Sequence, residues 1–198
     1  MILFRRPAQP TILDFLKSQA RLDFTYRGVG ATAEVPPPGY VLDHKRVELG
    51  MGEHVFAAAR AALESWGHFQ LGWVHAWPRD TLIQPGEVVA VIAHVMGIWW
   101  LNAARIVHVV DEVGPMRRFG FAYGTLPGHV ESGEERFSIE WDQARDTVCY
   151  DILAFSKPRH ILAKLGYPMV RRLQRRFARD SAAAMLREVQ QANDQQRA

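Results

Sequence analysis

Cysteine is almost absent from this sequence. Cys149 is the single cysteine of 198 residues, so the chain cannot form an internal disulfide, and no Cys/His cluster has the spacing of a zinc site. A chain of this length buries roughly 70% of the surface that its unfolded form exposes, so it can fold without a disulfide or a metal. The lack of disulfide cysteines suits a reducing compartment.

Long hydrophobic runs are missing as well. The longest apolar stretch without a formal charge covers residues 88–104. It contains a histidine and an asparagine, is shorter than the ~20 residues that span a bilayer, and is rich in β-formers. The N-terminus has Arg5, Arg6 and Pro7 where a signal peptide would have its apolar core. We therefore predict a soluble protein of the cytoplasm.

The motifs of common enzyme classes are also absent. The sequence has no glycine-rich phosphate loop and no GxSxG elbow. His75, His94 and His108 lie in apolar stretches, but the sequence fixes no carboxylate or nucleophile beside them. A core or cavity-wall role is expected for these histidines, and no catalytic residue or cofactor is predicted.

The elements that are present indicate an α+β fold. Residues 1–42, broken by glycine and proline, are expected to form an N-terminal arm on the main domain, residues 43–198, with one short helix over 11–19. Apolar periodicity predicts a helix over 53–66 and a long C-terminal helix over 169–191. Period-two patterns and turn residues predict strands over 44–49, 69–77, 87–96, 103–113, 117–126, 134–142 and 147–155.

The order of these elements predicts a curved antiparallel sheet wrapped around the long C-terminal helix. The strands between residues 99 and 157 should pair mainly with their neighbours in sequence. Because such a sheet curls and a single helix cannot fill its concave face, we expect a pocket of at least ~300 Å³ between them. On the helix, Phe177 should be buried and Arg175 exposed.

This element order resembles the helix-grip superfamily, which includes START lipid-transfer domains, the birch-pollen-allergen group and polyketide cyclases. Three segments resemble a narrower family, the domain of unknown function DUF1990. They are FGFAYGTLPGHVESGEERF at 119–137, YDILAFSKPRHILAKLGY at 150–167, and Tyr26 with Gly-Ala-Thr at 30–32. The resemblance implies the helix-grip fold over nearly the whole chain and assigns no role to any residue.

Large rings with polar tips are the first candidates for a ligand site. Tyr123, Trp141 and Tyr150 lie on strands expected to curl around the last helix, and such rings offer both apolar area and a hydrogen bond. Plain core packing is the alternative for each ring. Arg159 and His160 follow the last strand and are expected near the mouth, where they could receive an anionic head group or belong to a solvated loop.

A polar hairpin supplies another candidate, His129. It is two residues from Glu131, so on a strand the two side chains would share a face and could form a metal or acid–base pair. The alternative is a solvated hairpin tip with a salt bridge to Arg136. No third ligand is visible nearby, so no metal is predicted, and His129 is kept as a candidate ligand-binding residue.

An arginine stripe marks the outer face of the last helix. It consists of Arg171, Arg172, Arg175, Arg176 and Arg179. A solvated face is the favoured interpretation. Binding to an anionic membrane is a weaker alternative, because the sheet already needs the apolar side of this helix. Nucleic-acid binding is disfavoured, since no aromatic residues are interleaved for base stacking.

These observations support three functional hypotheses. The first is binding of a small apolar or amphipathic molecule in the pocket. The second is a cyclase- or hydrolase-like enzyme that uses a pocket histidine or carboxylate. The third is an adaptor that binds nucleic acid or anionic membrane through the arginine stripe. A group with a strongly perturbed pKa inside a roomy pocket would favour the second.

Overall fold

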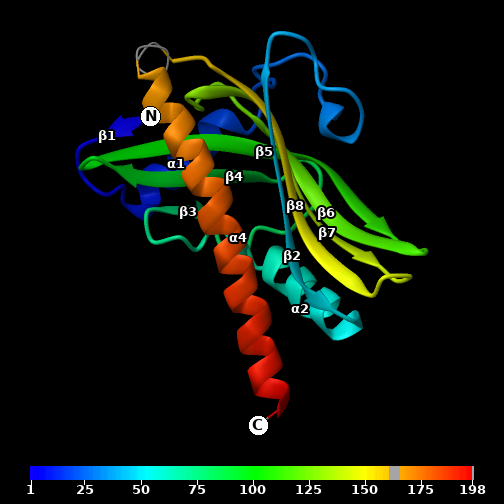
Figure 1. The fold of residues 1–198 in the computed structure, drawn as a ribbon. Helices are drawn as coiled ribbons and strands as arrows, with labels where there is room; N and C mark the ends of the chain where they lie inside the picture. Colours follow the sequence, from blue (N-terminus) through cyan, green and yellow to red (C-terminus); the bar gives the residue numbers. More distant parts are fainter. Residues whose placement is uncertain (161–165, 198) are drawn as a thin grey trace.

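A computed structural model describes residues 1–160 and 166–197 of the chain (Figure 1). The helices and strands are β1 (Ile2–Leu3), α1 (Gln9–Gln19), the short helix η1 (Ala31–Ala33), β2 (Val41–Met51), α2 (Glu53–Glu64), the short helix η2 (Gly67–Phe69), β3 (Val74–Trp77), β4 (Val88–Val95), β5 (Ile98–Glu112), β6 (Met116–Thr125), β7 (Glu131–Asp142), β8 (Thr147–Pro158) and α4 (Tyr167–Arg197). The fold is therefore α+β, as predicted.

The strands form one curled antiparallel sheet. Its order is β2-β8-β7-β6-β5-β4-β3, and β1 pairs with β5. From β3 to β8 each strand pairs antiparallel with its sequence neighbour. The predicted pairing between residues 99 and 157 is confirmed.

The two faces of the sheet have different chemistry because side chains alternate along each strand. On β7, Phe137 and Ile139 are fully buried on the concave face, in the core with α2 and α4. Arg136 and Glu140 alternate with them and form ion pairs on the convex face. This alternation was visible in the sequence and decides which side chains can reach the helix.

Helix α4 crosses the concave face (Figure 1). Its second half is anchored there because Ala182, Met185 and Val189 recur at helical spacing and are buried in the core. Ser181 is buried beside them and hydrogen-bonds the Tyr150 hydroxyl at 2.9 Å. The predicted C-terminal helix is confirmed, and it is longer than expected at both ends.

The first forty residues cover the convex face. Ile12, Phe15 and Leu16 of α1 pack on a cluster that includes Ile92 and Leu101, which point away from α4. Further along, Tyr26 packs with Ala31 and Phe155 on the same side of the sheet. Strand β2 begins at Val41, so it takes up the last two residues of the segment predicted as an arm.

The strand predicted over 69–77 is partly wrong. Only Val74–Trp77 forms β3, whereas Phe69 ends the short helix η2. The chain turns at Trp66, whose backbone is left-handed (φ 58°), and this turn places Trp66 and Phe69 together in the core. The alternating aromatic residues therefore reflect two separate packing sites and not one continuous strand.

No helix in the described part of the chain is both long and apolar enough to cross a bilayer.

Candidate functional site

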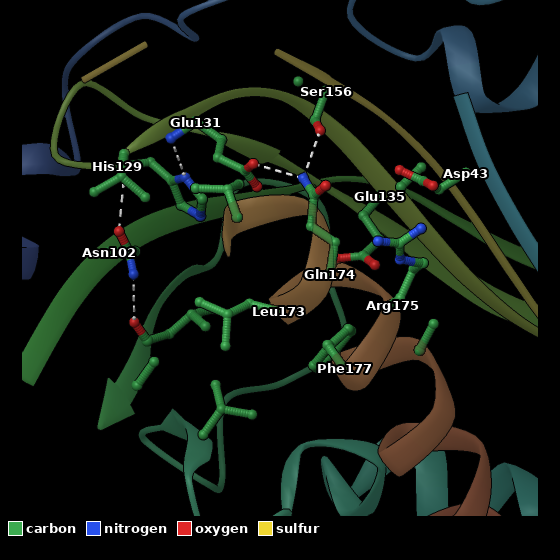
Figure 2. Close-up of a pocket in the computed structure, with 18 of the residues that line it drawn as sticks. Asp43, Asn102, His129, Glu131, Glu135, Ser156, Leu173, Gln174, Arg175 and Phe177 are labelled. Atoms are coloured by element: carbon green, nitrogen blue, oxygen red, sulfur yellow. Dashed lines mark hydrogen bonds between the residues drawn. The ribbon is translucent and has the colours of Figure 1, made fainter. Parts of the chain in front are cut away.

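A pocket of about 750 Å³ lies between the sheet and the first half of α4 (Figure 2). It exists because α4 is buried in the core only from Ser181 onward, while its earlier turns stand over the open end of the curled sheet. Apolar side chains make up much of the wall. They include Phe69, Val91, Val95, Trp100, Leu173 and Phe177.

Two carboxyl groups of β7 reach the pocket. Glu131 and Glu135 have the same strand parity as Phe137, so all three side chains are on the concave face. Tyr123 of β6 is the direct cross-strand partner of Glu135, and its hydroxyl donates a 2.7 Å hydrogen bond to Glu135 Oε2. The pocket thus combines apolar walls with a polar region built on two neighbouring strands.

Helix α4 contributes polar contacts to this region. The Gln174 amide donates to Glu131 Oε1 at 2.5 Å and to Ser156 Oγ at 3.0 Å, and Figure 2 shows the three side chains joined. One turn earlier, Arg171 donates two hydrogen bonds to the Asp43 carboxylate, at 2.5 and 2.6 Å. These contacts hold the first half of the helix across the sheet where apolar burial does not.

His129 presents a donor to the pocket. Its Nδ1 accepts a 3.0 Å hydrogen bond from the Glu131 backbone N–H, so the neutral ring carries its proton on Nε2. Burial and the nearby N-terminal ammonium lower the pKa of His129 to about 4, so the ring is neutral at pH 7. His129 precedes β7 and does not share a strand face with Glu131, so the side-chain pair considered as one alternative does not form. The other alternative, a salt bridge from the hairpin tip to Arg136, is not seen among the described residues either, because Arg136 pairs with Asp151.

The carboxyl groups of the pocket have perturbed acidity. Burial, reinforced by the negative charges of Glu131 and Asp43, raises the pKa of Glu135 to about 7, and the Tyr123 hydrogen bond opposes this only in part. Burial also raises the pKa of Glu131, against the opposing effect of its hydrogen bond from Gln174. Desolvation disfavours the charged form, which is the usual cause of such shifts.

Glu135 is therefore expected to be half protonated close to pH 7. Side-chain ¹³C-carboxyl NMR over a pH titration measures this directly, and Glu135→Gln assigns the resonance by removing it. If the assigned resonance instead gave the ordinary pKa of a glutamate, the prediction would be wrong, and the Glu135 carboxyl group would be better hydrated than its buried position implies.

Only some of the predicted site residues come together. Tyr123 and His129 line the pocket. Tyr150 is fully buried beneath α4, bonded to Ser181, and Trp141 packs on Phe56 of α2 and donates to Asp146. Trp141 has the expected strand parity, but it lies at the far end of β7, where α2 covers the sheet.

Arg159 and His160 lie just beyond β8. Both backbone N–H groups donate to the Val130 carbonyl, and the Arg159 guanidinium donates to the Pro127 carbonyl at 2.6 Å. Their side chains are exposed, and neither is among the described pocket-lining residues. The charged groups that do line the pocket are of both signs: Asp43, Glu131, Glu134 and Glu135 are acidic, and Lys45, Arg175 and Arg179 are basic.

The expectations for α4 are met in part. Arg175 is exposed, as predicted, but Phe177 is only half-buried. Its ring contacts Phe69 and Phe137, with centroids at 5.0 and 6.2 Å, and its remaining surface faces the pocket. Phe177 is therefore a pocket wall and not a closed core residue.

Other arginines of the stripe pair with acids. Arg176 and Arg179 both contact Asp180, which also accepts a hydrogen bond from Trp73. No group of three or more metal-ligating side chains is found in residues 1–160 and 166–197.

Comparison with known proteins places the chain in a family. The family model described as "Domain of unknown function (DUF1990)" matches residues 25–184. The chain belongs to the DUF1990 family. A UPF0548 protein of Dictyostelium discoideum is 38% identical over 96% of both chains. A UPF0548 protein of Arabidopsis thaliana is 36% identical over 84% of this chain and 86% of its own.

Solved structures share the fold at low sequence identity. A START superfamily protein from Mycobacterium smegmatis has a TM-score of 0.51 at 14% identity, over 77% of this chain and 99% of its own. Human STARD10 has a TM-score of 0.51 at 10% identity, over 98% of this chain and 84% of its own. These similarities confirm the helix-grip fold and no more.

The DUF1990 match spans the whole described pocket. Its lining residues run from Asp43 to Arg179, inside the matched range, whereas α1 lies before it. Glu131 is a candidate from the sequence, whereas Glu135 and Gln174 are pocket residues that only the structure identifies. Glu135 could have been found, since it shares strand parity with Phe137. The contact of Gln174 with Glu131 on β7 could not be found in this way, because it depends on where α4 crosses the sheet.

Proposed function

We propose that this protein binds a small apolar or amphipathic molecule in the pocket between the sheet and α4. The supporting observation is a volume of about 750 Å³ with apolar walls and a few hydrogen-bonding groups gathered in one region. Small-molecule sites have about this size and this distribution of polar groups. The START-like fold is compatible with such a role.

The polar region makes simple core packing a poorer explanation. Burying a carboxyl group costs free energy unless it gains partners, and two are placed here beside Val91, Leu173 and Phe177. A core selected for stability alone would place apolar side chains at these positions. Groups of this kind are typical of sites that orient a ligand.

Filling the pocket should abolish binding. Ala154 of β8 lines the pocket, and Ala154→Trp is expected to weaken any bound apolar probe at least about tenfold by removing its space. Native mass spectrometry after expression identifies retained molecules, and fluorescence titration with a decyl-chain series measures affinity.

Ala144→Trp is the matched control, because Ala144 is exposed in the turn between β7 and β8. It should bind like the wild type. Equal binding by both variants, or binding of no probe by a folded wild type, would refute the proposal.

A proton-transfer enzyme is the second candidate function. The specific observation is a pocket carboxyl group, Glu135, whose pKa is raised to about 7 while it is hydrogen-bonded to Tyr123. General acid–base catalysis works best with a pKa near the working pH. Chemical change in a molecule recovered from the protein, lost in Glu135→Gln, would favour this activity over binding alone.

A further inference from the structure

The polar region of the pocket has more negatively charged acceptors than donors. Glu135 Oε2 accepts from Tyr123 and Glu131 Oε1 accepts from Gln174. The other oxygen of each carboxyl group has no hydrogen-bond partner among the described residues. An ionised carboxyl group can accept about four hydrogen bonds, so both retain capacity toward the pocket.

The cations near these acids form no ion pair with Glu131 or Glu135 in the described part of the chain. Arg171 is held by Asp43 in two hydrogen bonds and also donates to Gln174. Lys45 and Arg175 line the pocket and form no ion pair with either glutamate among the described residues, and the third lining cation, Arg179, is paired with Asp180. Neither acid therefore forms an ion pair with an ammonium or guanidinium group among the described residues, although the positive charge of Arg171 lowers the pKa of Glu131.

We propose that the bound molecule carries a basic nitrogen: it is an apolar amine whose ammonium group is received by Glu135 while its chain lies along Leu173 and Phe177. This inference rests on the proposed function. Tyr123 fixes one carboxylate oxygen and leaves the other for the ligand N–H. A charge-assisted bond of this kind is about twice as strong as a neutral one. It also supplies the countercharge that the buried acid lacks.

The neutral imidazole of His129 is compatible with this ligand. Because its pKa is lowered to about 4, His129 adds no positive charge at pH 7 that would repel an ammonium group. The titratable and charged groups that face Glu135 or line the pocket come from five elements and one turn. They are Asp43, His44 and Lys45 from β2, Tyr123 from β6, Glu131 and Glu134 from β7, Tyr150 from β8, His129 from the turn before β7, and Arg171, Arg175 and Arg179 from α4.

Binding of an ammonium group must be linked to proton release. Glu135 has to be ionised to receive the ligand, and its pKa of about 7 means that part of the population holds a proton at neutral pH. Affinity for an amine should therefore rise with pH up to about 7, by as much as about tenfold per unit, and then level off. An alkyl carboxylate would show the opposite trend, and an alcohol little trend.

Three decyl probes that differ only in their polar group test the inference. Calorimetric titration with decylamine, decan-1-ol and decanoate between about pH 6 and 8 keeps the amine charged throughout. We expect decylamine to bind tightest at the upper end. Glu135→Gln should weaken decylamine about tenfold or more, remove its pH dependence, and change decanol by less than about threefold.

Glu140→Gln is the charge-matched control, since Glu140 is on the same strand but on the convex face with Arg46. It should leave all three affinities unchanged. If Glu135→Gln fails to fold, the decylamine affinity of Glu131→Gln and the pH dependence of decylamine binding by the wild type still test whether the pocket acids bind the ammonium group.

If decanoate bound tightest, or if decanol and decylamine bound equally well, the inference that the ligand is an amine would be wrong. The proposal that the pocket binds an apolar molecule would still stand. Failure of all three probes to bind the folded wild type would overturn both.

Discussion

Replacing Glu134 by glutamine is expected to lower the free energy of unfolding by about 3 kcal/mol. Glu134 lies on β7 between the two pocket acids but points to the convex face, where it is 2% exposed. There its carboxylate accepts four hydrogen bonds from the first forty residues, so one buried charge ties that segment to the sheet.

The geometry explains why an isosteric change is expected to be costly. The Tyr26 hydroxyl and the Gly30 N–H donate to Oε2, both at 2.7 Å, while the Thr32 N–H and hydroxyl donate to Oε1. A glutamine amide would replace one oxygen with a donor and set it against a backbone N–H. That N–H would then be buried without a partner, in addition to the loss of the charge-assisted bonds.

Gly124 is part of the same arrangement. A Cβ at this position would overlap the Tyr26 hydroxyl, so the ring can lie over β6 only because residue 124 has no side chain. Glycines in the middle of strands often mark such a close approach. The DUF1990-like segment 119–137 thus contains both Gly124, which leaves space for the Tyr26 ring, and Glu134, which accepts the hydrogen bond of its hydroxyl.

Urea denaturation followed by tryptophan fluorescence measures the stability loss, and trypsin tests release of the segment at the exposed Arg21 and Arg27. Glu135→Gln is the control, because it changes the adjacent residue on the opposite face and should cost less than about 1 kcal/mol. Equal stability of the two variants, or no faster cleavage in Glu134→Gln, would mean that the carboxylate does not hold the segment.

The strands and the last helix could be predicted because their patterns are local. Phe137 and Ile139 alternate with polar residues along β7, and the apolar side of α4 recurs at helical spacing, so each element's inner face follows from sequence alone. Strand parity also places Glu135 on the same face as Phe137. The fold class and the existence of a concave face follow from such patterns.

The position of the pocket along the strands could not be predicted in the same way. Trp141 and Glu135 have the same strand parity, yet Trp141 is covered by α2 whereas Glu135 lines the pocket. The difference is set by where α2 and α4 cross the sheet, which depends on packing between residues far apart in sequence. His68 was missed for a related reason, since it follows a helix and has no periodic signal of its own.

His68 is a fully buried histidine whose replacement by phenylalanine is expected to stabilise the protein. Its ring is 0% exposed, and neither nitrogen has a hydrogen-bond partner among the described residues. Aromatic rings surround it, with Phe137 and Phe69 at centroid distances of 4.6 and 4.8 Å and Trp66 stacked at 5.7 Å. Removing the desolvated nitrogens should add about 1 kcal/mol at pH 7, after a small penalty for the larger ring.

The advantage of His68→Phe should grow as the pH falls. Burial lowers the pKa of His68 to about 3 in the folded state, whereas in the unfolded chain it is about 6.5. Between these values the unfolded state binds one more proton, so the wild type loses about 1.4 kcal/mol of stability per pH unit on acidification through this group. The variant lacks the group, and the other titrating residues cancel in the difference between the two proteins.

Urea denaturation of both proteins between about pH 7.5 and 5 should therefore give curves that diverge below pH 6.5, by about 2 kcal/mol at pH 5 in addition to the gap at pH 7. His54→Phe provides the control, because His54 is exposed on α2 and its replacement should stay within about 0.5 kcal/mol at every pH. Parallel curves for wild type and His68→Phe would show that His68 titrates alike in both states. A variant less stable than wild type at pH 7 would mean that the imidazole makes a polar contact worth more than its desolvation.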